Sequence, residues 1–416
     1  MSAPYRQPAT QPLNWRALAD FPDLLVRRSA PEVWSAFAGS ESDEWVIAAR
    51  PNAGPIFSKP QDDGAWAGHL TFGHPGVIDH VESRFLQGHS PSARWWRPDI
   101  LLLGGDRGLR SATDADGAGG HLVRSLCSAG ARRGGGRGAS EWERRTSKER
   151  YLTSVGTLLR HIQRGDIYEV NYCTERTAHL PGFDPFTTFG RLLAHTDAPF
   201  AALYRHGDFF ALCMSPEHFL RADGGRVITR PMKGTRRRSP DPALDAALIQ
   251  ELANDPKERS ENIMAVDVAR HDLSRIAASG SVRVEELCAV KSYPNVHQLV
   301  STVSAELRNG LHAWDAVRTA FPMASMTGAP KLSALRLIDA MEDMPRGLFS
   351  GSLGYQLPGG TLDLNVVIRT ITYDASTGRA SLITGSAITA LSDPEQEWEE
   401  CELKAMSVLN ALGHAG

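Results

Sequence analysis

Apolar residues recur at two different spacings along the chain, and the longer spacing predicts helices. Between residues 151 and 162 they follow one another three or four positions apart, as on one face of a helix, and Gly165 follows as a stop signal. The same reasoning predicts helices over residues 256–278 and 331–341, and one more near the C-terminus.

Short apolar runs bounded by turn residues predict strands, most of them paired as hairpins. The expected strands are residues 44–49, 100–103, 200–204 and 208–214, a hairpin that turns at 223–225, and three strands within 351–373 and 379–388. Because the hairpins are separated by grouped helices, we expect an α+β fold rather than a parallel, Rossmann-like sheet.

Composition divides the chain near residue 140. Residues 104–138 are rich in Gly, Arg, Ala and Asp, which predicts a solvated loop or linker that has no core of its own. An RNA-binding role for its arginines is the weaker interpretation, because no aromatic residues are interleaved with them. We therefore expect a short N-terminal region over residues 1–140 and a main domain over residues 145–412.

Charge and composition exclude several classes of protein. The net charge is -3 and 42% of the residues are hydrophobic, so no overall field attracts nucleic acid or an anionic membrane, and a large core is expected. No apolar run approaches the roughly 18 residues of a membrane helix, and no signal peptide is apparent. The five cysteines are scattered, which favours a reducing cytoplasm and disfavours structural zinc.

The last helix carries a pair of carboxylates. Asp393 suits the N-cap, Pro394 suits the first helical position, and Gln396 can complete a capping box. Glu397 and Glu400 then lie in the first two turns, three residues apart and on one face. Acidic residues near a helix N-terminus are also explained by the helix dipole alone, so this pair does not establish a site.

A second pair, Glu258 and Glu261, has the same spacing on the predicted helix over residues 256–278. Clusters of carboxylates without a His or Cys partner suit Mg²⁺. The alternative is again a solvated helix face.

Lys233 is the candidate nucleophile. It lies between Pro231 and Gly234, so we expect it on a turn, where partial burial would let it lose its proton near neutral pH. Glu217 opens the hairpin whose second arm ends near Lys233, and we expect the two within about 10 Å of each other. An acid beside a nucleophile suits an acid-assisted displacement, although a salt bridge at a strand end is an equal alternative.

Three further features suit an anionic ligand. Residues 327–331 and 384–387 are glycine-containing turns whose N–H groups can bind anions, although neither has the spacing of a Walker loop. Arg369 interrupts an otherwise apolar strand, and an arginine in such a place commonly binds a carboxylate.

Taken in order, these motifs resemble the chorismate-utilising enzymes over about residues 145–412. The family includes anthranilate synthase component I, aminodeoxychorismate synthase component I, isochorismate synthase and salicylate synthase. The resemblance is carried by residues 165–171, 215–217, 231–235, 257–262, 327–331, 351–355, 368–370 and 394–404. It implies a large α/β sandwich of two packed, mostly antiparallel sheets with outer helices, and a chorismate pocket between them.

The resemblance also implies roles for individual residues. The metal ligands for Mg²⁺ would be Glu258, Glu261, Glu397 and Glu400, and Glu217 would be the general acid. The remaining substrate-binding positions would be Gly234, Thr235, Thr327, Tyr355, Arg369, Gly385, Ser386 and Lys404.

Lys233 indicates the branch of the family. Anthranilate and salicylate synthases usually carry Ala there, whereas the resemblance to aminodeoxychorismate synthases implies a covalent lysine intermediate, ammonia from a glutamine amidotransferase subunit, and a product that leads to 4-aminobenzoate and folate. Glu169 departs from the Gln that is usual in ammonia-using members, and His271 from a usual Asn. Anthranilate synthase and a silent scaffold for the amidotransferase are the alternatives.

Overall fold

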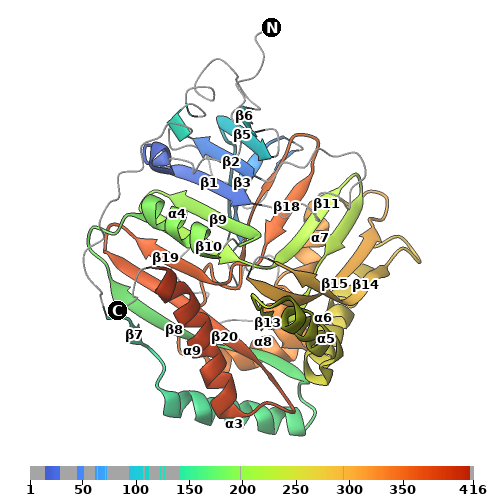
Figure 1. Ribbon diagram of the computed structural model, residues 1–416. Coiled ribbons are helices and arrows are strands. Elements are labelled where there is room, and N and C mark those ends of the chain that lie inside the picture. Colours follow the sequence, from blue (N-terminus) through green and yellow to red (C-terminus); the bar gives the residue numbers. More distant parts are fainter. Residues whose placement is uncertain are drawn as a thin grey trace.

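The computed structural model describes residues 15–28, 45–50, 61–62, 64–70, 72, 93–105, 108–111, 122, 125–126, 141–196, 198–293 and 295–412. Their strands form two large sheets, and every strand pair among them is antiparallel (Figure 1). None of the helices in these ranges combines the length and the hydropathy that a membrane crossing requires.

The first sheet contains both the N-terminal strands and the longest C-terminal strand. In spatial order it consists of β16 (Gly328–Ala329), β8 (Glu169–His179), β20 (Arg379–Thr389), β19 (Thr370–Asp374), β10 (Phe209–Ser215), β9 (Phe200–His206), β1 (Asp23–Arg28), β2 (Trp45–Arg50), β5 (Ile100–Gly105) and β6 (Gly108–Ser111), with β7 (Glu143–Arg144) paired to β8. We refer to it as sheet A.

The second sheet, sheet B, is built mainly from the middle of the chain. It consists of β13 (Met232–Arg237), β15 (Val296–Glu306), β12 (Arg226–Thr229), β11 (His218–Asp223), β18 (Leu362–Asn365), β17 (Ser352–Gln356), β3 (Trp66–Leu70) and β4 (Ala93–Trp96), with β14 (Arg283–Ser292) paired to β15. Strands β3 and β4 come from the N-terminal region, so that region extends both sheets.

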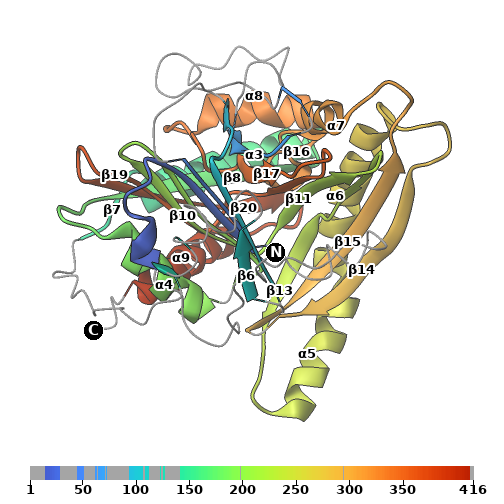
Figure 2. The ribbon, with the colours of Figure 1, turned by 90° about the horizontal axis from the view of Figure 1, so that it is seen from above.

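Helices cover the outer faces of the sheets. The described helices are η1 (Trp15–Leu18), α3 (Lys148–Gln163), α4 (Pro185–Thr196), α5 (Pro242–Asn254), α6 (Pro256–Ser274), α7 (Ala313–Ala320), η2 (Ala324–Met326), α8 (Lys331–Met341) and α9 (Pro394–Ala411). Helix α9 lies across β20 (Figure 1), and α5 and α6 run beside β14 and β15 (Figure 2).

Alternation along the strands of sheet A explains the layered core. In β1, Leu24 and Val26 join the cluster under α4 and α9, whereas Leu25 joins the cluster between the two sheets. In β10, Leu212 and Cys213 divide in the same way. Because successive side chains of a strand point to opposite faces, both faces of sheet A are buried and its strands read as continuous apolar runs. The expected sandwich of packed sheets with outer helices is confirmed.

Most helix predictions are confirmed, and two of them closely. Helix α8 has the predicted bounds, and α9 begins at Pro394 with the Asp393 side chain accepting a hydrogen bond from Gln396 N at 3.0 Å. Helix α6 ends at Ser274 rather than at residue 278, because the chain turns there into a bridge between Ala277 and Leu307.

Two strand predictions need correction. The segment expected to hold three strands holds four, because β18 ends at Asn365 in sheet B and β19 begins at Thr370 in sheet A. The predicted loop over residues 104–138 contains strand β6; apart from the end of β5 and residues 122, 125 and 126, the rest of that loop lies outside the described residues.

A fully buried charge cluster joins the two sheets. Asp363 of β18 pairs with Arg27 of β1 at 3.1 Å and with Arg221 of β11 at 3.3 Å, and all three side chains are completely buried. Burial opposes the charge on Asp363, but His218 and the two arginines outweigh it and hold the pKa of that carboxyl well below its usual range. The carboxylate is thus the shared partner of cations from both sheets.

Replacing Asp363 tests this cluster. We expect Asp363→Asn to lower the free energy of unfolding by about 3–5 kcal/mol, because two buried arginines lose their carboxylate. Urea denaturation of Asp267→Asn is the control, since Asp267 (63% exposed) and Arg270 (53% exposed) form a surface pair that is expected to contribute less than about 1 kcal/mol. Equal losses in the two variants would contradict a bridging role.

Candidate active site

The predicted site residues gather where the two sheets and two helices approach one another. Charged side chains come from β13 of sheet B, from β8 of sheet A, from helices α6 and α9 and from the turn before β11, whereas β20 of sheet A contributes backbone groups (Figure 1). These segments are far apart in the sequence, so the site exists only in the folded chain.

Lys233 pairs directly with Glu169, and the pair connects sheet B to sheet A. Lys233 Nζ donates a hydrogen bond to Glu169 Oε1 at 2.6 Å, and the side chains are only 10% and 4% exposed. Burial opposes the charge on Lys233, but the carboxylates of Glu169 and Glu261 outweigh it and raise the pKa of Lys233. The prediction that this lysine loses its proton near neutral pH is therefore wrong for the protein without substrate.

Lys233 also lies in a strand rather than on a turn. It pairs with Leu299 of β15, and the register shifts between Lys233 and Thr235, which marks a β-bulge at Gly234. Gly234 has a φ of +79°, and a Cβ there would lie 3.0 Å from Glu258 Oε2. A glycine at this bulge therefore lets β13 approach α6, while the side chain of Thr235 faces solvent.

Glu217 has the properties of a proton donor at neutral pH. It is 4% exposed and its Oε1 accepts a hydrogen bond from Ser325 Oγ at 2.6 Å. Burial raises the pKa of Glu217 to about 7, although Ser325 and three cations act in the opposite direction; those cations are Lys233, Lys404 and Arg369. The effect of Lys233 on Glu217 shows that the structure brings these two predicted residues into one site.

Arg369 occupies the crossing from sheet B to sheet A. It lies between β18 and β19, not within one strand as expected, and it has a φ of +50°. Its carbonyl accepts a hydrogen bond from Met214 N, whereas its guanidinium makes no hydrogen bond or ion pair with any described residue. Burial lowers the pKa of Arg369, and the negative charge of Glu217 raises it by a smaller amount. The guanidinium is therefore free to bind an anion.

Lys404 joins helix α9 to strand β20. Its Nζ donates a hydrogen bond to Gly385 O at 2.8 Å and pairs with Glu400 at 2.6 Å. A Cβ at Gly385 would lie 2.5 Å from Cys173 Sγ, so only glycine fits here between β20 and β8. The structure thus brings Gly385 and Lys404 together, as predicted.

Two of the four predicted metal ligands, Glu397 and Glu261, both pair with Lys257. Its Nζ lies 3.4 Å from Glu397 Oε1 on α9 and 4.0 Å from Glu261 Oε1 on α6. Burial raises the pKa of Glu261 to about 7 and raises that of Glu258 as well. Glu400 also acts on Glu258, which places the two pairs within electrostatic reach.

These carboxylates are not arranged as a preformed metal cage. No group of three or more Asp, Glu, His or Cys side chains stands at coordination distance in the part of the chain that the structure describes. Glu397 is nevertheless 2% exposed and its Oε2 has no hydrogen-bond partner there. At least one carboxylate oxygen of the cluster is therefore available to coordinate a metal ion.

Three predicted substrate-binding side chains are occupied elsewhere. Tyr355 is 1% exposed within the core cluster between the sheets, near Arg27. The hydroxyl of Thr327 donates to Met323 O at 3.1 Å and closes the η2 turn. Ser386 Oγ is buried against Tyr151 OH at 2.8 Å, so only its backbone faces the site.

Two contributors were missed by sequence reasoning. Ser325 has no local signal, because its contact with Glu217 spans 108 positions. Lys257 lies directly beside Glu258 on the predicted helix, and its spacing of four to Glu261 could have identified it. The site as a whole combines a buried acid, a paired lysine, three further cations and a carboxylate cluster, which suits acid-assisted chemistry on an anionic substrate.

Known proteins are similar to this chain over much of its length. Residues 87–410 match the family model described as chorismate binding enzyme. A protein named aminodeoxychorismate synthase from Streptomyces griseus is 43% identical over 275 residues, which are 66% of this chain and 38% of the relative. Aminodeoxychorismate synthase component 1 from Klebsiella aerogenes is 41% identical over 273 residues, 66% of this chain and 60% of the relative.

A relative with another name is almost as similar. Anthranilate synthase component 1 from Haloferax volcanii is 40% identical over 270 residues, 64% of this chain and 51% of the relative. The chain thus spans only 38% to 60% of the length of these three curated relatives.

Solved structures share the fold. Anthranilate synthase component I from Streptococcus pneumoniae has a TM-score of 0.73 at 23% identity, over 85% of this chain and 82% of that one. MenF, the menaquinone-specific isochorismate synthase from Escherichia coli, has a TM-score of 0.75 at 18% identity, over 99% and 94%.

The pairing of Lys233 can be tested without any assay of activity. We expect Glu169→Gln to lower the pKa of Lys233 by about 1–3 units, because the amide removes the charge that stabilises the ammonium form. NMR titration of ¹³C-methylated lysines measures this. Glu395→Gln is the matched control, since Glu395 pairs with the exposed Lys148. An unchanged titration of Lys233 in Glu169→Gln would contradict the interpretation.

Proposed function

The chain belongs to the chorismate binding enzymes, and from this premise we propose that it converts chorismate and ammonia to 4-amino-4-deoxychorismate. The observation that carries the proposal is Lys233, buried in reach of the acid Glu217 and held by Glu169. The names of the relatives from Streptomyces griseus and Klebsiella aerogenes support the same reaction.

Lys233, Glu169 and Glu217 each have a distinct role in the proposed reaction. Lys233 Nζ transfers a proton to Glu169 and attacks C2 of the ring; the Nζ–C2 bond forms, the ring double bonds shift and the C4–O bond breaks. Glu217 donates its proton to the departing hydroxyl, which leaves as water. Ammonia then attacks C4 while the C2–Nζ bond breaks, and Lys233 regains its proton from Glu169.

The cations of the site suit the two carboxylates of chorismate. Arg369 has an uncommitted guanidinium and Lys404 lies beside the Gly385 carbonyl, so both can bind a carboxylate. Backbone N–H groups near Gly385 and Ser386 are proposed to complete this contact. Gly234, Thr235 and Thr327 are proposed to shape the pocket through their backbone, and Tyr355 stays a prediction that its buried position does not support.

We also propose that Mg²⁺ is held by Glu258, Glu261, Glu397 and Glu400. The donor set is all oxygen, and the orphan Oε2 of Glu397 supports the fit. When bound, the ion supplies positive charge for a carboxylate of the substrate. Lys257 supplies such charge to Glu397 and Glu261 in the structure described above.

Ammonia is proposed to come from a glutamine amidotransferase subunit. The name component 1, carried by the Klebsiella relative, implies at least one further component. A reducing cytoplasm is the proposed compartment, in keeping with the free Cys173, Cys213, Cys288 and Cys401.

The proposed reaction is tested by incubating the chain with chorismate, Mg²⁺ and an ammonium salt, with and without a lyase that releases 4-aminobenzoate. We expect 4-aminobenzoate only with the lyase, and a loss of at least about 100-fold in Lys233→Ala, because the nucleophile is gone. The control Lys148→Ala removes an exposed lysine and is expected to retain activity. Fluorescent anthranilate as the product would instead support the alternative that the Haloferax relative suggests. No product, even with an added amidotransferase, would favour a silent scaffold.

Metal binding is expected to depend on pH. Glu261 has a pKa of about 7, so its carboxyl is protonated and a poor ligand near pH 5 but ionised near pH 8. Mg²⁺ should therefore raise the melting temperature more at the higher pH, and Glu261→Gln should remove most of that difference. A stabilisation by Mg²⁺ that is equal at both pH values would contradict the assignment of Glu261.

A further inference from the structure

In the proposed reaction Glu217 gives its proton to the departing water, and because the amine product leaves in its ammonium form, that proton has to be replaced from solvent. Glu217 is 4% exposed before any substrate is bound, and a bound ring beside Lys233 and Arg369 would cover it further. The need for a second route to Glu217 rests on the function proposed above. The structure offers such a route on the side of Glu217 that faces helix α6.

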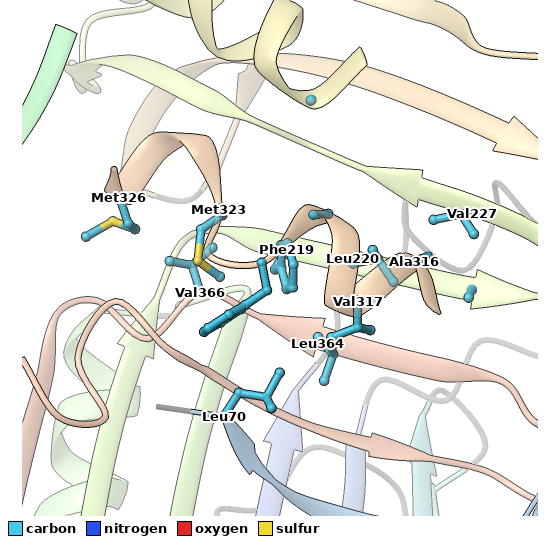
Figure 3. Close-up of a cluster of buried hydrophobic side chains, with 14 of the residues drawn as sticks. Leu70, Phe219, Leu220, Val227, Ala316, Val317, Met323, Met326, Leu364 and Val366 are labelled. Atoms are coloured by element: carbon cyan, nitrogen blue, oxygen red, sulfur yellow. The ribbon is translucent and has the colours of Figure 1, made fainter. Parts of the chain in front are cut away.

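A small cavity lies against Glu217, with a volume of about 20 Å³. Its lining includes Glu217, Ser325 and Thr229 as well as Asp272 of α6. Phe219 and Met323 also line it, and Figure 3 shows both within a cluster of buried apolar side chains. A cavity of this size holds one water molecule, and the acidic side chains provide polar partners for it.

Asp272 also lines a second, much larger cavity. This cavity has a volume of about 930 Å³ and lies between α6, α7 and the start of α8, where exposed side chains such as those of His271 and Arg275 line it. Asp272 itself is 5% exposed. It is thus a buried carboxylate that borders a solvent-accessible cavity on one side and the cavity of Glu217 on the other.

The charges around Asp272 suit the passage of a proton. Lys331 Nζ donates a hydrogen bond to Asp272 Oδ2 at 2.5 Å and another to Ala320 O at 3.0 Å, which fixes the carboxylate in place. His271 Nδ1 lies 3.7 Å from Asp272 Oδ1, and the histidine side chain is 72% exposed. Arg275 is the other cation that acts on Asp272. An imidazole is the side chain that exchanges protons with water most readily near neutral pH.

We propose that His271, Asp272 and one water molecule in the small cavity form a proton relay that reloads Glu217 after each turnover. The imidazolium of His271 gives its proton to Asp272, Asp272 gives one to the water, and the water gives one to the Glu217 carboxylate. His271 is then reprotonated by solvent or buffer. The relay takes up one proton per cycle, Glu217 passes it to the departing hydroxyl, and the product leaves as the C4 ammonium, so protons and charge balance over a cycle.

The relay is needed only after the first turnover, so its loss should slow later turnovers but not the first. With enzyme in excess over chorismate at about pH 6, Glu217 starts protonated, because its pKa is about 7. We therefore expect Asp272→Asn to leave the single-turnover rate and the KM for chorismate within about twofold, but to lower steady-state kcat about tenfold. Rapid-quench and steady-state product measurements on the same preparation compare the two rates. Equal slowing of both, or of neither, overturns the proposal.

His271→Asn provides a variant whose folding is not in question, since the side chain is exposed. In dilute buffer we expect a lower kcat that added imidazole restores, because imidazole takes over the exchange with solvent. Asp267→Asn is the matched control: it lies on the same helix, borders the same large cavity and is expected to show neither effect. If Asp272→Asn does not fold, an unchanged kcat in His271→Asn, or a loss that imidazole does not restore, overturns the relay.

The two proposals fail in different ways. A wild-type protein that makes no aminodeoxychorismate refutes the proposed function. An active wild-type protein whose relay variants behave like Asp267→Asn refutes the relay alone.

Discussion

A charged group buried between two apolar sheets must have a partner, and this constraint shapes the molecule. Asp363 satisfies this requirement with Arg27 and Arg221 and thereby joins sheet A to sheet B. Lys233 and Glu169 meet it in the same way at the other junction of the sheets. The fold is therefore held together by the same kind of contact that assembles the site.

The site contains buried groups whose charge or hydrogen-bonding capacity the described residues satisfy only in part. Arg369 has no ion-pair partner among the described residues, Glu397 keeps an orphan oxygen, and the pKa of Glu217 is raised to about 7. A buried charge or polar oxygen without a partner is unfavourable. A ligand that supplies the missing partners therefore gains binding free energy. Such a pocket favours a small, strongly anionic substrate over a neutral one.

The sequence predicted those features that depend on contacts between residues close together in the chain. Asp393 and Pro394 mark the start of α9 because capping acts within one turn, and the spacing of Glu258 and Glu261 follows from the helix itself. The protonation of Lys233 could not be predicted, because Glu169 is 64 positions away and its contact depends on how two sheets pack.

The crossing of the chain from sheet B to sheet A could not be predicted either, because no local signal in the sequence marks it. Residues 366–368 are apolar and read as part of one strand, yet β18 ends at Asn365 in sheet B and β19 begins at Thr370 in sheet A. The motifs identified the family because many short signals occurred in one order, whereas each position inside the pocket needed the folded chain.

At the bulge in β13, one residue sets the course of the backbone and its neighbour carries the reactive side chain. The backbone of β13 is directed by a glycine that touches Glu258, while Lys233 projects from the residue before it. An exchange at position 233 therefore leaves the course of the strand unaltered. A scaffold built in this way can acquire a different reaction through a single codon, because its architecture and its reactivity are encoded at neighbouring but independent positions.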